Sequence, residues 1–264
     1  MQLMKLRQEE TVFMLRDYKL EMEKRVDFIR GVVNNSGARG IIYGNSGGKD
    51  SALVGILCKA ACDDTVGLIM PCGSKRNYGE DFSDAMAVAD QYKIEARTVD
   101  LSAAAQSMKD ALGAAVQISE PASVNIAPRL RMTALYAAAA SEGRLVAGTG
   151  NRSETYMGYF TKWGDGACDF NPIADLTVTE VLEFLRYLGA PDRIIEKAPS
   201  AGLFDGQTDE SEMGITYKSI DSFLLSGECT AEEMEIIKKH HMGSEHKRAP
   251  RIALDRELGE RNSP

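Results

Sequence analysis

Histidine and cysteine are scarce in this sequence, which limits the metal and disulfide chemistry open to it. The chain has 264 residues, of which five are cysteines and three are histidines. An odd number of cysteines in a chain of this size does not favour a disulfide framework. Cys58 and Cys62 lie four residues apart, but no Cys-x-x-Cys pair with a nearby histidine completes a zinc site. We therefore expect buried free thiols.

A long apolar run and an excess of positive charge are also missing. No apolar segment is as long as a membrane span, and the charged N-terminus lacks the apolar region of a signal peptide. The net charge of −8 argues against a general nucleic-acid surface, although it leaves room for a local basic pocket. We expect a cytoplasmic enzyme with no membrane and no nucleic-acid partner.

The bulk composition is that of a globular protein with a full core. The hydrophobic fraction is 44%, and the length fits one large α/β domain or two small ones. No internal repeat or low-complexity segment is present. We expect a single domain over residues 1–264, with residues 1–16 as a candidate mobile tail.

One short stretch has the composition of a phosphate-binding loop. A β-branched apolar segment at 40–43 leads into it, and an apolar segment at 52–58, typical of a buried helix, follows it. Strand, glycine-rich loop and helix together offer backbone N–H groups and the positive end of a helix to an anion. The two glycines can adopt the positive φ that turns N–H groups inward, although an ordinary Gly-Ser turn is the alternative. The stretch consists of Gly44, Asn45, Ser46, Gly47, Gly48, Lys49, Asp50 and Ser51.

This loop differs from a Walker A loop at two positions. A Walker A loop has Gly, four residues and then Gly-Lys-Ser/Thr. Here Tyr43 stands in place of the first glycine, and Asp50 stands in place of the hydroxyl residue. Because a carboxylate beside a phosphate is repulsive unless a cation lies between them, Asp50 indicates Mg²⁺.

Strand-like and helical segments alternate along much of the chain. The run at 65–70 is almost continuously apolar, as in parallel strands buried on both faces. The alternation predicts an α/β fold: an open, doubly wound, mostly parallel sheet with helices on both faces. We expect strands at 40–43, 65–70, 94–99 and 144–147, and helices at 11–35, 52–58, 80–92, 101–117, 126–142, 178–188, 217–225 and 231–241.

A second glycine-containing loop, residues 148–153, follows the last predicted strand. It nearly matches a Rossmann fingerprint, but Ser153 replaces the third glycine and no strand ending in an acid follows about twenty residues later. Because carboxyl ends of parallel strands share one edge of the sheet, this loop and residues 44–51 are expected to face one site. Residues 159–170 are aromatic, glycine-rich and charged, which is typical of a ligand loop or of an ordinary surface loop.

These motifs together resemble one enzyme family. Residues 44–51 resemble the Ser-Gly-Gly-x-Asp-Ser signature of the PP-loop ATP pyrophosphatases, which cleave ATP between the α- and β-phosphates. The later motifs narrow the resemblance to the ammonia-dependent NAD synthetases, which have an adenine nucleotide alpha-hydrolase-like fold. It covers about residues 20–250 and rests on Gly-Thr-Gly-Asn-Arg-Ser-Glu from 148, Gly-Tyr-Phe-Thr-Lys-Trp-Gly-Asp-Gly from 158, Pro-Ile-Ala-Asp-Leu-Thr from 172, Lys-Ala-Pro-Ser-Ala-Gly-Leu from 197, Gly-Gln-Thr-Asp-Glu from 206 and Glu-His-Lys-Arg from 245.

The resemblance implies a two-step ligase reaction with ATP as co-substrate. The nicotinate carboxylate of deamido-NAD attacks the α-phosphate of ATP and releases pyrophosphate, and ammonia then displaces AMP to give NAD. A carboxylate needs this activation because its oxygen is a poor leaving group. The resemblance also implies a homodimer. Because the chain lacks the residues that a glutaminase domain would need, we expect ammonium rather than glutamine as the nitrogen source.

The resemblance also assigns roles to individual residues. It implies Asp50 and Glu154 as magnesium ligands, with Asp50 also catalytic. Asp165 is a candidate for orienting ammonium or taking its proton. The positions matching ATP contacts are 44–51, Thr149, Val178 and Ser200; those matching deamido-NAD contacts are Arg129, Lys162, Asp169, His246 and Lys247.

Two positions depart from the family pattern. Asn45 replaces a small or aliphatic residue, and Val178 stands where many members carry a lysine that contacts an ATP phosphate. Lys49, Lys75 and Arg76 are candidates for the missing charge. Two alternatives stay open from the residues: another PP-loop adenylating enzyme that modifies tRNA or forms an amide, and a nucleotide-binding homologue with weakened catalysis. The negative net charge argues against a tRNA substrate.

Overall fold

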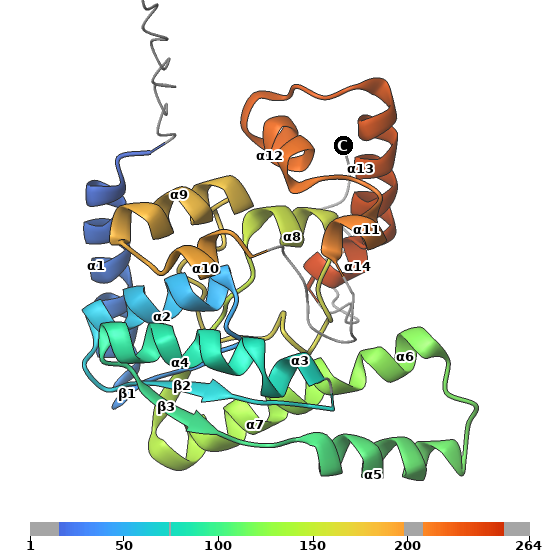
Figure 1. Cartoon of the computed structure of the whole chain (residues 1–264), viewed down its shortest axis with the longest axis horizontal. Helices are drawn as coiled ribbons and strands as arrows, with labels where there is room; N and C mark the ends of the chain where they lie inside the picture. The colour runs from blue at the N-terminus through green and yellow to red at the C-terminus, as the bar shows by residue number, and fades with distance from the viewer. Residues whose placement is uncertain (1–15, 74, 198–207, 251–264) are drawn as a thin grey trace, which may run out of the picture.

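The computed structural model describes residues 16–73, 75–197 and 208–250. Within them the chain forms one four-stranded sheet in which all neighbouring strands are parallel, in the order β3-β2-β1-β4 (Figure 1). The strands are β1 (Gly40–Gly44), β2 (Thr65–Ile69), β3 (Glu95–Thr98) and β4 (Arg144–Ala147).

The strand order reverses beside β1. From β1 the chain adds β2 and then β3 on one side, and it returns to place β4 on the other side. Tyr43 near the end of β1 is level with Ala147, the last residue of β4. In open α/β sheets the crevice at the carboxyl ends of the strands, where the order reverses, is where ligands bind. The loops after β1 and β4 therefore flank one crevice.

One face of the sheet is covered by two layers of helices. Helices α2 (Lys49–Ala61) and α4 (Glu80–Tyr92) pack against the strands, and α9 (Val178–Leu188) and α10 (Asp192–Ile195) lie on the outer side of α2 (Figure 1). Helix α1 (Tyr18–Ser36) packs beside α2 and runs from the level of α9 down to the sheet (Figure 1). Tyr43 is fully buried in this core, and Gly55 and Gly67 leave room for its ring, since a Cβ there would lie 2.3 and 3.0 Å from its hydroxyl.

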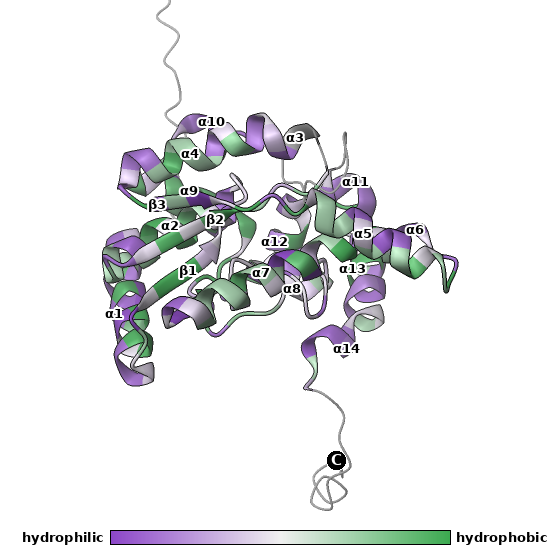
Figure 2. Ribbon diagram, turned by 90° about the horizontal axis from the view of Figure 1, so that it is seen from below, coloured by the Kyte–Doolittle hydropathy of each residue, from purple (hydrophilic) through white to green (hydrophobic). Residues whose placement is uncertain are grey.

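The opposite face is covered mainly by α7 (Ile126–Glu142), with α5 (Ser102–Gly113) beside it. The apolar side chains of Ile42, Val66 and Val146 pack here against Leu135 and Ala139 of α7. Figure 2 shows apolar residues concentrated in β1 and in the helices next to it. With helices on both faces of a parallel sheet, the predicted doubly wound architecture is confirmed.

Another group of helices forms a smaller cluster beyond the end of the sheet (Figure 1). The apolar side chains of Met157, Met213 and Ile220 meet there. The cluster contains α8 (Arg152–Met157), α11 (Asp209–Met213), α12 (Tyr217–Ser226) and α13 (Ala231–Gly243), and the chain also has short helices α3 (Lys75–Tyr78), α6 (Glu120–Val124) and α14 (Glu245–Arg248).

The predicted elements match α4, α7, β4 and α9 to the residue. Other predicted elements differ in detail. The strands predicted at 65–70 and 94–99 span 65–69 and 95–98, and the short helices α3, α6, α10, α11 and α14 were not predicted. Residues 16–17 are not helical, because Asp17 is the N-cap of α1; the helix predicted to reach residue 117 ends at Gly113; and α8 was not predicted. The candidate mobile tail lies, apart from its last residue, outside the described residues. No helix in the described ranges is long and apolar enough to cross a membrane.

Candidate active site

A cavity of about 930 Å³ lies at the carboxyl edge of the sheet, between the loops after β1 and β4. This volume is in the range of ligand pockets, about 300–1,000 Å³. Its wall contains seven of the eight residues of the predicted phosphate-binding stretch, Gly47 being the exception, together with Thr149 and Glu154. The two loops that the sequence placed at one site do meet.

The bend in the first loop requires one glycine. Gly47 has φ +74°, and a Cβ on it would lie 2.2 Å from the carbonyl oxygen of Asp81. Gly48 has an ordinary extended backbone with φ −94° and is the N-cap of α2. Because α2 begins at Lys49, the N–H groups of its first turn have no partner within the helix. They remain available to an anion in the cavity.

Polar side chains hold this loop in shape. Ser46 Oγ accepts from the N–H of Gly48 at 3.3 Å and lies 3.1 Å from Ser51 Oγ, which donates to the carbonyl of Gly48 at 3.0 Å. Asn45, the first departure from the family pattern, is 2% exposed and donates to the carbonyl of Ala85 in α4 at 3.1 Å. Its amide thus fixes the loop to the core.

Asn151 joins the second loop to the first. Its Oδ1 accepts from the N–H of Glu154 at 2.9 Å, and its own N–H donates to Glu154 Oε2 at 3.2 Å, so it forms a capping box at the start of α8. Its Nδ2 donates to Asp50 Oδ1 at 3.0 Å. One fully buried side chain therefore orients both acids that were predicted as metal ligands.

The two acids also share one cation. Lys49 Nζ lies 2.7 Å from Asp50 Oδ2 and 4.0 Å from Glu154 Oε1. Burial lowers the pKa of Lys49, but the charges of Asp50 and Glu154 outweigh it and hold the pKa above its usual range. Burial and the charge of Asp50 raise the pKa of Glu154 to about 8, against the opposing effect of Lys49. The site is therefore rich in negative charge, which the ammonium of Lys49 balances in part.

Two residues that the sequence did not single out close this cluster. The ring of Tyr217 lies under Lys49 Nζ, 5.5 Å from it, and its hydroxyl donates to Asp209 Oδ2 at 3.1 Å. Asp209 is 4% exposed and contributes a third negative charge near Lys49. No set of three or more His, Cys, Asp or Glu side chains in the described ranges has the arrangement of a complete metal centre.

Arg131 is another residue that the motifs did not reveal. It lines the cavity, donates from Nε to the carbonyl of Met70 at 3.0 Å and from Nη2 to Asn77 Oδ1 at 3.1 Å. Burial lowers the pKa of its guanidinium. Its place beside the end of β2 puts a cation on the cavity wall.

The loop at 158–169 forms the outer wall of the cavity. Asp165 faces the cavity and accepts a hydrogen bond from the N–H of Thr161 at 3.1 Å. Loss of water around its carboxylate raises the pKa of Asp165. Lys247 also lines the cavity and donates to the carbonyls of Gly158 and Phe160, both at 2.7 Å. Burial lowers the pKa of Lys247. The loop is thereby tied to α14.

Four residues predicted to bind the second substrate are not on the cavity wall. Arg129 donates to the carbonyl of Lys162 at 3.4 Å, and Lys162 Nζ donates to the carbonyl of His246. Asp169 Oδ2 accepts from the N–H of Val146 at 2.8 Å, where the chain continues the sheet beside β4. The structure thus brings these residues to the same loop without placing them in the cavity.

The last two predicted ATP contacts have different outcomes. Val178 is 3% exposed, packs in the apolar cluster with Met213 and Ile220, and does not line the cavity. Ser200 lies outside the described residues. Lys49, Lys75 and Arg76 were the candidates to replace the positive charge that the family lysine would supply at position 178. The structure describes the side chain of Lys49 among them, and Lys49 lines the cavity.

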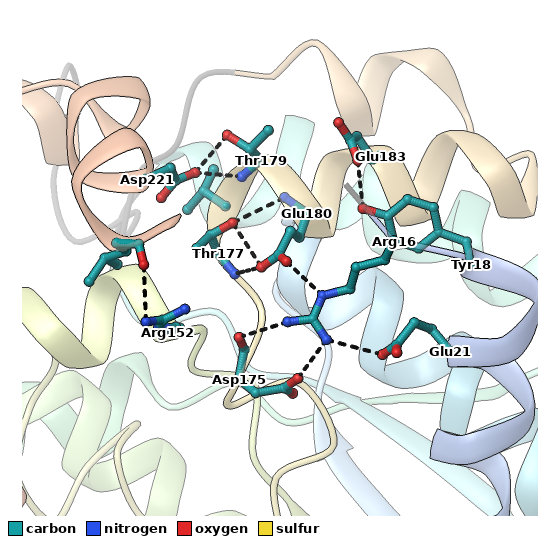
Figure 3. Close-up of polar contacts among 12 residues, drawn as sticks. Arg16, Tyr18, Glu21, Arg152, Asp175, Thr177, Thr179, Glu180, Glu183 and Asp221 are labelled. Atoms are coloured by element: carbon teal, nitrogen blue, oxygen red, sulfur yellow. Dashed lines mark hydrogen bonds and ion pairs between the residues drawn. The ribbon is translucent and has the colours of Figure 1, made fainter. Parts of the chain in front are cut away.

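Buried hydrogen bonds anchor the helix that carries Glu154. Asp221 of α12 accepts from Ser153 Oγ at 2.5 Å and from the N–H and hydroxyl of Thr179, both at 2.7 Å. Figure 3 shows Asp221 at the start of α9 and, beside it, Arg16 in contact with Glu180. Helices α8, α9 and α12 therefore meet at one buried carboxylate next to the site.

A doubly wound parallel sheet with a glycine-bent anion loop and two acids at its point of strand reversal defines an α/β nucleotide-activating enzyme. The sequence profile of the NAD synthase family matches residues 21–253. The chain belongs to this family, and the predicted family, fold and ligase class are confirmed.

Relatives and solved structures agree with this placement. The chain is 47% identical over 243 residues to the NH(3)-dependent NAD(+) synthetase of Carboxydothermus hydrogenoformans, covering 90% of this chain and 98% of that one. It is 46% identical over 210 residues to the corresponding protein of Archaeoglobus fulgidus, covering 79% and 83%.

Two solved structures are similar over most of the chain. An NMN synthetase from Francisella tularensis has a TM-score of 0.86 and 38% identity, with 91% of this chain and 99% of that one covered. An NH3-dependent NAD synthetase from Campylobacter jejuni has a TM-score of 0.74 and 29% identity, with 91% and 100% covered.

Proposed function

We propose that this chain catalyses the ATP-dependent amidation of deamido-NAD by ammonia, which gives NAD, AMP and pyrophosphate. Membership of the NAD synthase family supports the reaction. One structural observation carries the proposal for the site: Asp50 and Glu154, in the first turns of two helices about a hundred residues apart, both contact the ammonium of Lys49 at the edge of one cavity.

The chemistry needs positive charge around the α-phosphate. A carboxylate oxygen forms a bond to that phosphorus while the bond to pyrophosphate breaks; ammonia then attacks the carbonyl carbon, and the C–O bond to AMP breaks. Negative charge builds on phosphate oxygens in the first step. The N–H groups at the start of α2, together with the side chains of Lys49, Arg131 and Lys247 on the cavity wall, are the groups that can stabilise it.

The donor set around Lys49 fits a magnesium ion. Mg²⁺ prefers oxygen ligands and is usually held by one or two carboxylates together with substrate phosphates and water. Asp50 and Glu154 supply two carboxylates, and burial together with the charge of Asp50 raises the pKa of Glu154. We assign the metal to these two residues; when bound, it would neutralise charge on the phosphates.

The remaining residue assignments follow the motif positions. Asp165, exposed to the cavity and with a raised pKa, is proposed to orient ammonium or to take its proton. Thr149 on the cavity wall and Ser200 are proposed ATP contacts. Five residues are proposed to bind deamido-NAD, and they lie in the loop at 158–169 or next to it. They are Arg129, Lys162, Asp169, His246 and Lys247.

An assay that omits one component at a time tests this proposal. Purified protein with ATP, Mg²⁺, deamido-NAD and ammonium should form NAD and AMP in equal amounts, and each omission should abolish both. Asp50→Ala should lower the rate by about 10²–10³, the usual effect of removing one charge-stabilising group. Asp63→Ala, at an exposed acid after α2, serves as the control. Neither product from active, folded protein would reject the reaction.

A second candidate substrate deserves a direct comparison. The similarity to an NMN synthetase, with a TM-score of 0.86, favours nicotinate mononucleotide as an alternative carboxylate substrate. Both substrates carry the same nicotinate carboxylate, so the reaction is unchanged and only the pocket beyond it differs. We expect a higher kcat/KM for deamido-NAD; a higher value for the mononucleotide would reassign the substrate.

Three broader properties belong to the same proposal. We propose a homodimer, which light scattering of the purified protein tests by mass. We propose a cytoplasmic location, in agreement with free thiols at all five cysteines. We also propose that residues 1–264 form one domain, which a single cooperative unfolding transition would support.

A further inference from the structure

Lys49 occupies an unusual place for a lysine at the start of a helix. It is 7% exposed, and its Nζ is held by Asp50 at 2.7 Å, by Glu154 at 4.0 Å and by the ring of Tyr217 at 5.5 Å. A buried ammonium is stable only when its charge is paired. The same two carboxylates are the proposed ligands of the divalent cation. Lys49 and that cation therefore need the same oxygen atoms.

The overlap is a competition for position, because Nζ already lies against carboxylate oxygens of both acids. When all three acids are ionised, Asp50, Glu154 and Asp209 contribute three negative charges, and Lys49 contributes one positive charge among them. With Lys49 in place, the ionised cluster keeps an excess of two negative charges, which a divalent cation would neutralise. Nζ and a divalent ion cannot both lie against the same carboxylate oxygens without strong repulsion.

We infer that Lys49 is an internal counter-ion of the ligand-free site, which the divalent cation displaces from Asp50 and Glu154 and which then pairs with a phosphate of ATP. The inference rests on the proposed function. A displaced buried ammonium needs another anion. The nearest candidate is the nucleotide phosphate in the cavity that Lys49 already lines, next to the N–H groups of its own helix. Lys49 thus couples metal entry to nucleotide binding.

This role and a purely structural one have opposite consequences for metal binding. If Lys49 competes with the cation, its removal tightens metal binding in the absence of nucleotide and weakens ATP binding. If Lys49 only holds the site together, its removal weakens both. The two binding constants of one variant therefore separate the roles.

The experiment titrates Mn²⁺ into nucleotide-free protein and follows free Mn²⁺ by electron paramagnetic resonance. We expect Lys49→Gln to bind Mn²⁺ about tenfold or more tightly than the unaltered protein, because one positive charge beside two ligands is gone. Lys49→Arg keeps the charge and should bind Mn²⁺ no more tightly than the unaltered protein. Lys59→Gln, a lysine in the last turn of the same helix, is the matched control.

Melting temperatures in EDTA and in Mn²⁺ protect the test against a variant that is unstable without metal. Lys49→Gln leaves two half-buried acids without their cation, so its melting temperature should rise more with Mn²⁺ than that of the unaltered protein does. Unchanged or weaker Mn²⁺ binding by Lys49→Gln, an equal gain in melting temperature, or tighter Mn²⁺ binding by Lys49→Arg would overturn the inference. If the unaltered protein forms NAD and these results are obtained, the counter-ion role is rejected and the proposed function stands.

Discussion

Asn151 Nδ2 donates a hydrogen bond to Asp50 Oδ1 at 3.0 Å, and through it the loop after β4 is fixed against the loop after β1. The same side chain caps α8 through the N–H of Glu154. The relative position of the two proposed metal ligands therefore depends on a neutral amide that contacts both. Partners of this kind commonly contribute 10–100-fold to metal affinity, as an order of magnitude.

Two substitutions at Asn151 separate its two tasks. Asn151→Ser keeps a good N-cap but is too short for the bond to Asp50, so we expect weaker metal binding, by about tenfold, at nearly unchanged stability. Asn151→Ala should show the same loss of metal binding and also lose about 1 kcal/mol of stability. Titration with Mn²⁺ and urea denaturation measure the two effects. Normal metal binding by both variants would refute the bridging role.

Asp221 should act on the site through Ser153. Asp221→Asn leaves a single oxygen for partners that now use two, so one buried group loses its acceptor at a cost of about 1–3 kcal/mol. Because Ser153 precedes Glu154, we also expect a higher KM for Mg²⁺. Ser153→Ala completes a double-mutant cycle. The double variant should lose less stability than the sum of the losses of the two single variants. A loss equal to that sum would show that the two residues act independently.

Tyr43 offers a site at which removing a polar atom should do no harm. Its hydroxyl is buried and has no hydrogen-bond partner among the residues that the structure describes. We expect Tyr43→Phe to be as stable as the unaltered protein or more stable by about 1 kcal/mol, because no bond is lost. The control is Tyr18→Phe, since the buried Tyr18 hydroxyl donates to Glu183 at 2.7 Å and its loss should destabilise the chain. Urea denaturation compares the two; a large loss for Tyr43→Phe contradicts this assignment.

Asp175 should make part of the free energy of unfolding depend on pH in the acid range. Burial raises its pKa, but the hydrogen bonds and charge of Arg25, aided by Arg16, outweigh this and hold the pKa below its ordinary value of 3.8. The contribution is therefore present above pH 3.8 and disappears as the pH falls through the lower pKa of the folded state.

The matched test compares two acid-to-amide variants across pH. Asp175→Asn should lose stability relative to the unaltered protein near about pH 6, and the difference should vanish near about pH 2. Asp90→Asn, at an exposed acid of α4, should show no such pH-dependent difference. A difference for Asp175→Asn that persists in acid would mean that the carboxylate charge is not responsible.

The sequence predicted the layers of the fold more completely than the contacts in the site. Near-continuous apolar strands that alternate with helices predicted the parallel sheet, because strands buried on both faces have few other arrangements. Helix α8 was missed because its six residues are too few for a periodic pattern. The Asn-x-x-Glu spacing of its capping box was the available signal.

Contacts between distant segments were not predictable in the same way. Asp50 and Glu154 were placed on one edge by strand order, but the amide of Asn151 and the ring of Tyr217 come together only through tertiary packing. Val178 shows a different case: its motif position predicts an ATP contact, whereas in the structure its side chain is buried in an apolar cluster.

Crystals grown with Mn²⁺ and a non-hydrolysable ATP analogue test the central claim most directly. Anomalous scattering at the manganese edge locates the cation without reference to activity. The account requires one cation in contact with the carboxylates of both Asp50 and Glu154 and with a phosphate oxygen of the nucleotide. A cation bound to only one of these acids, or a nucleotide bound with the cation elsewhere, would contradict it.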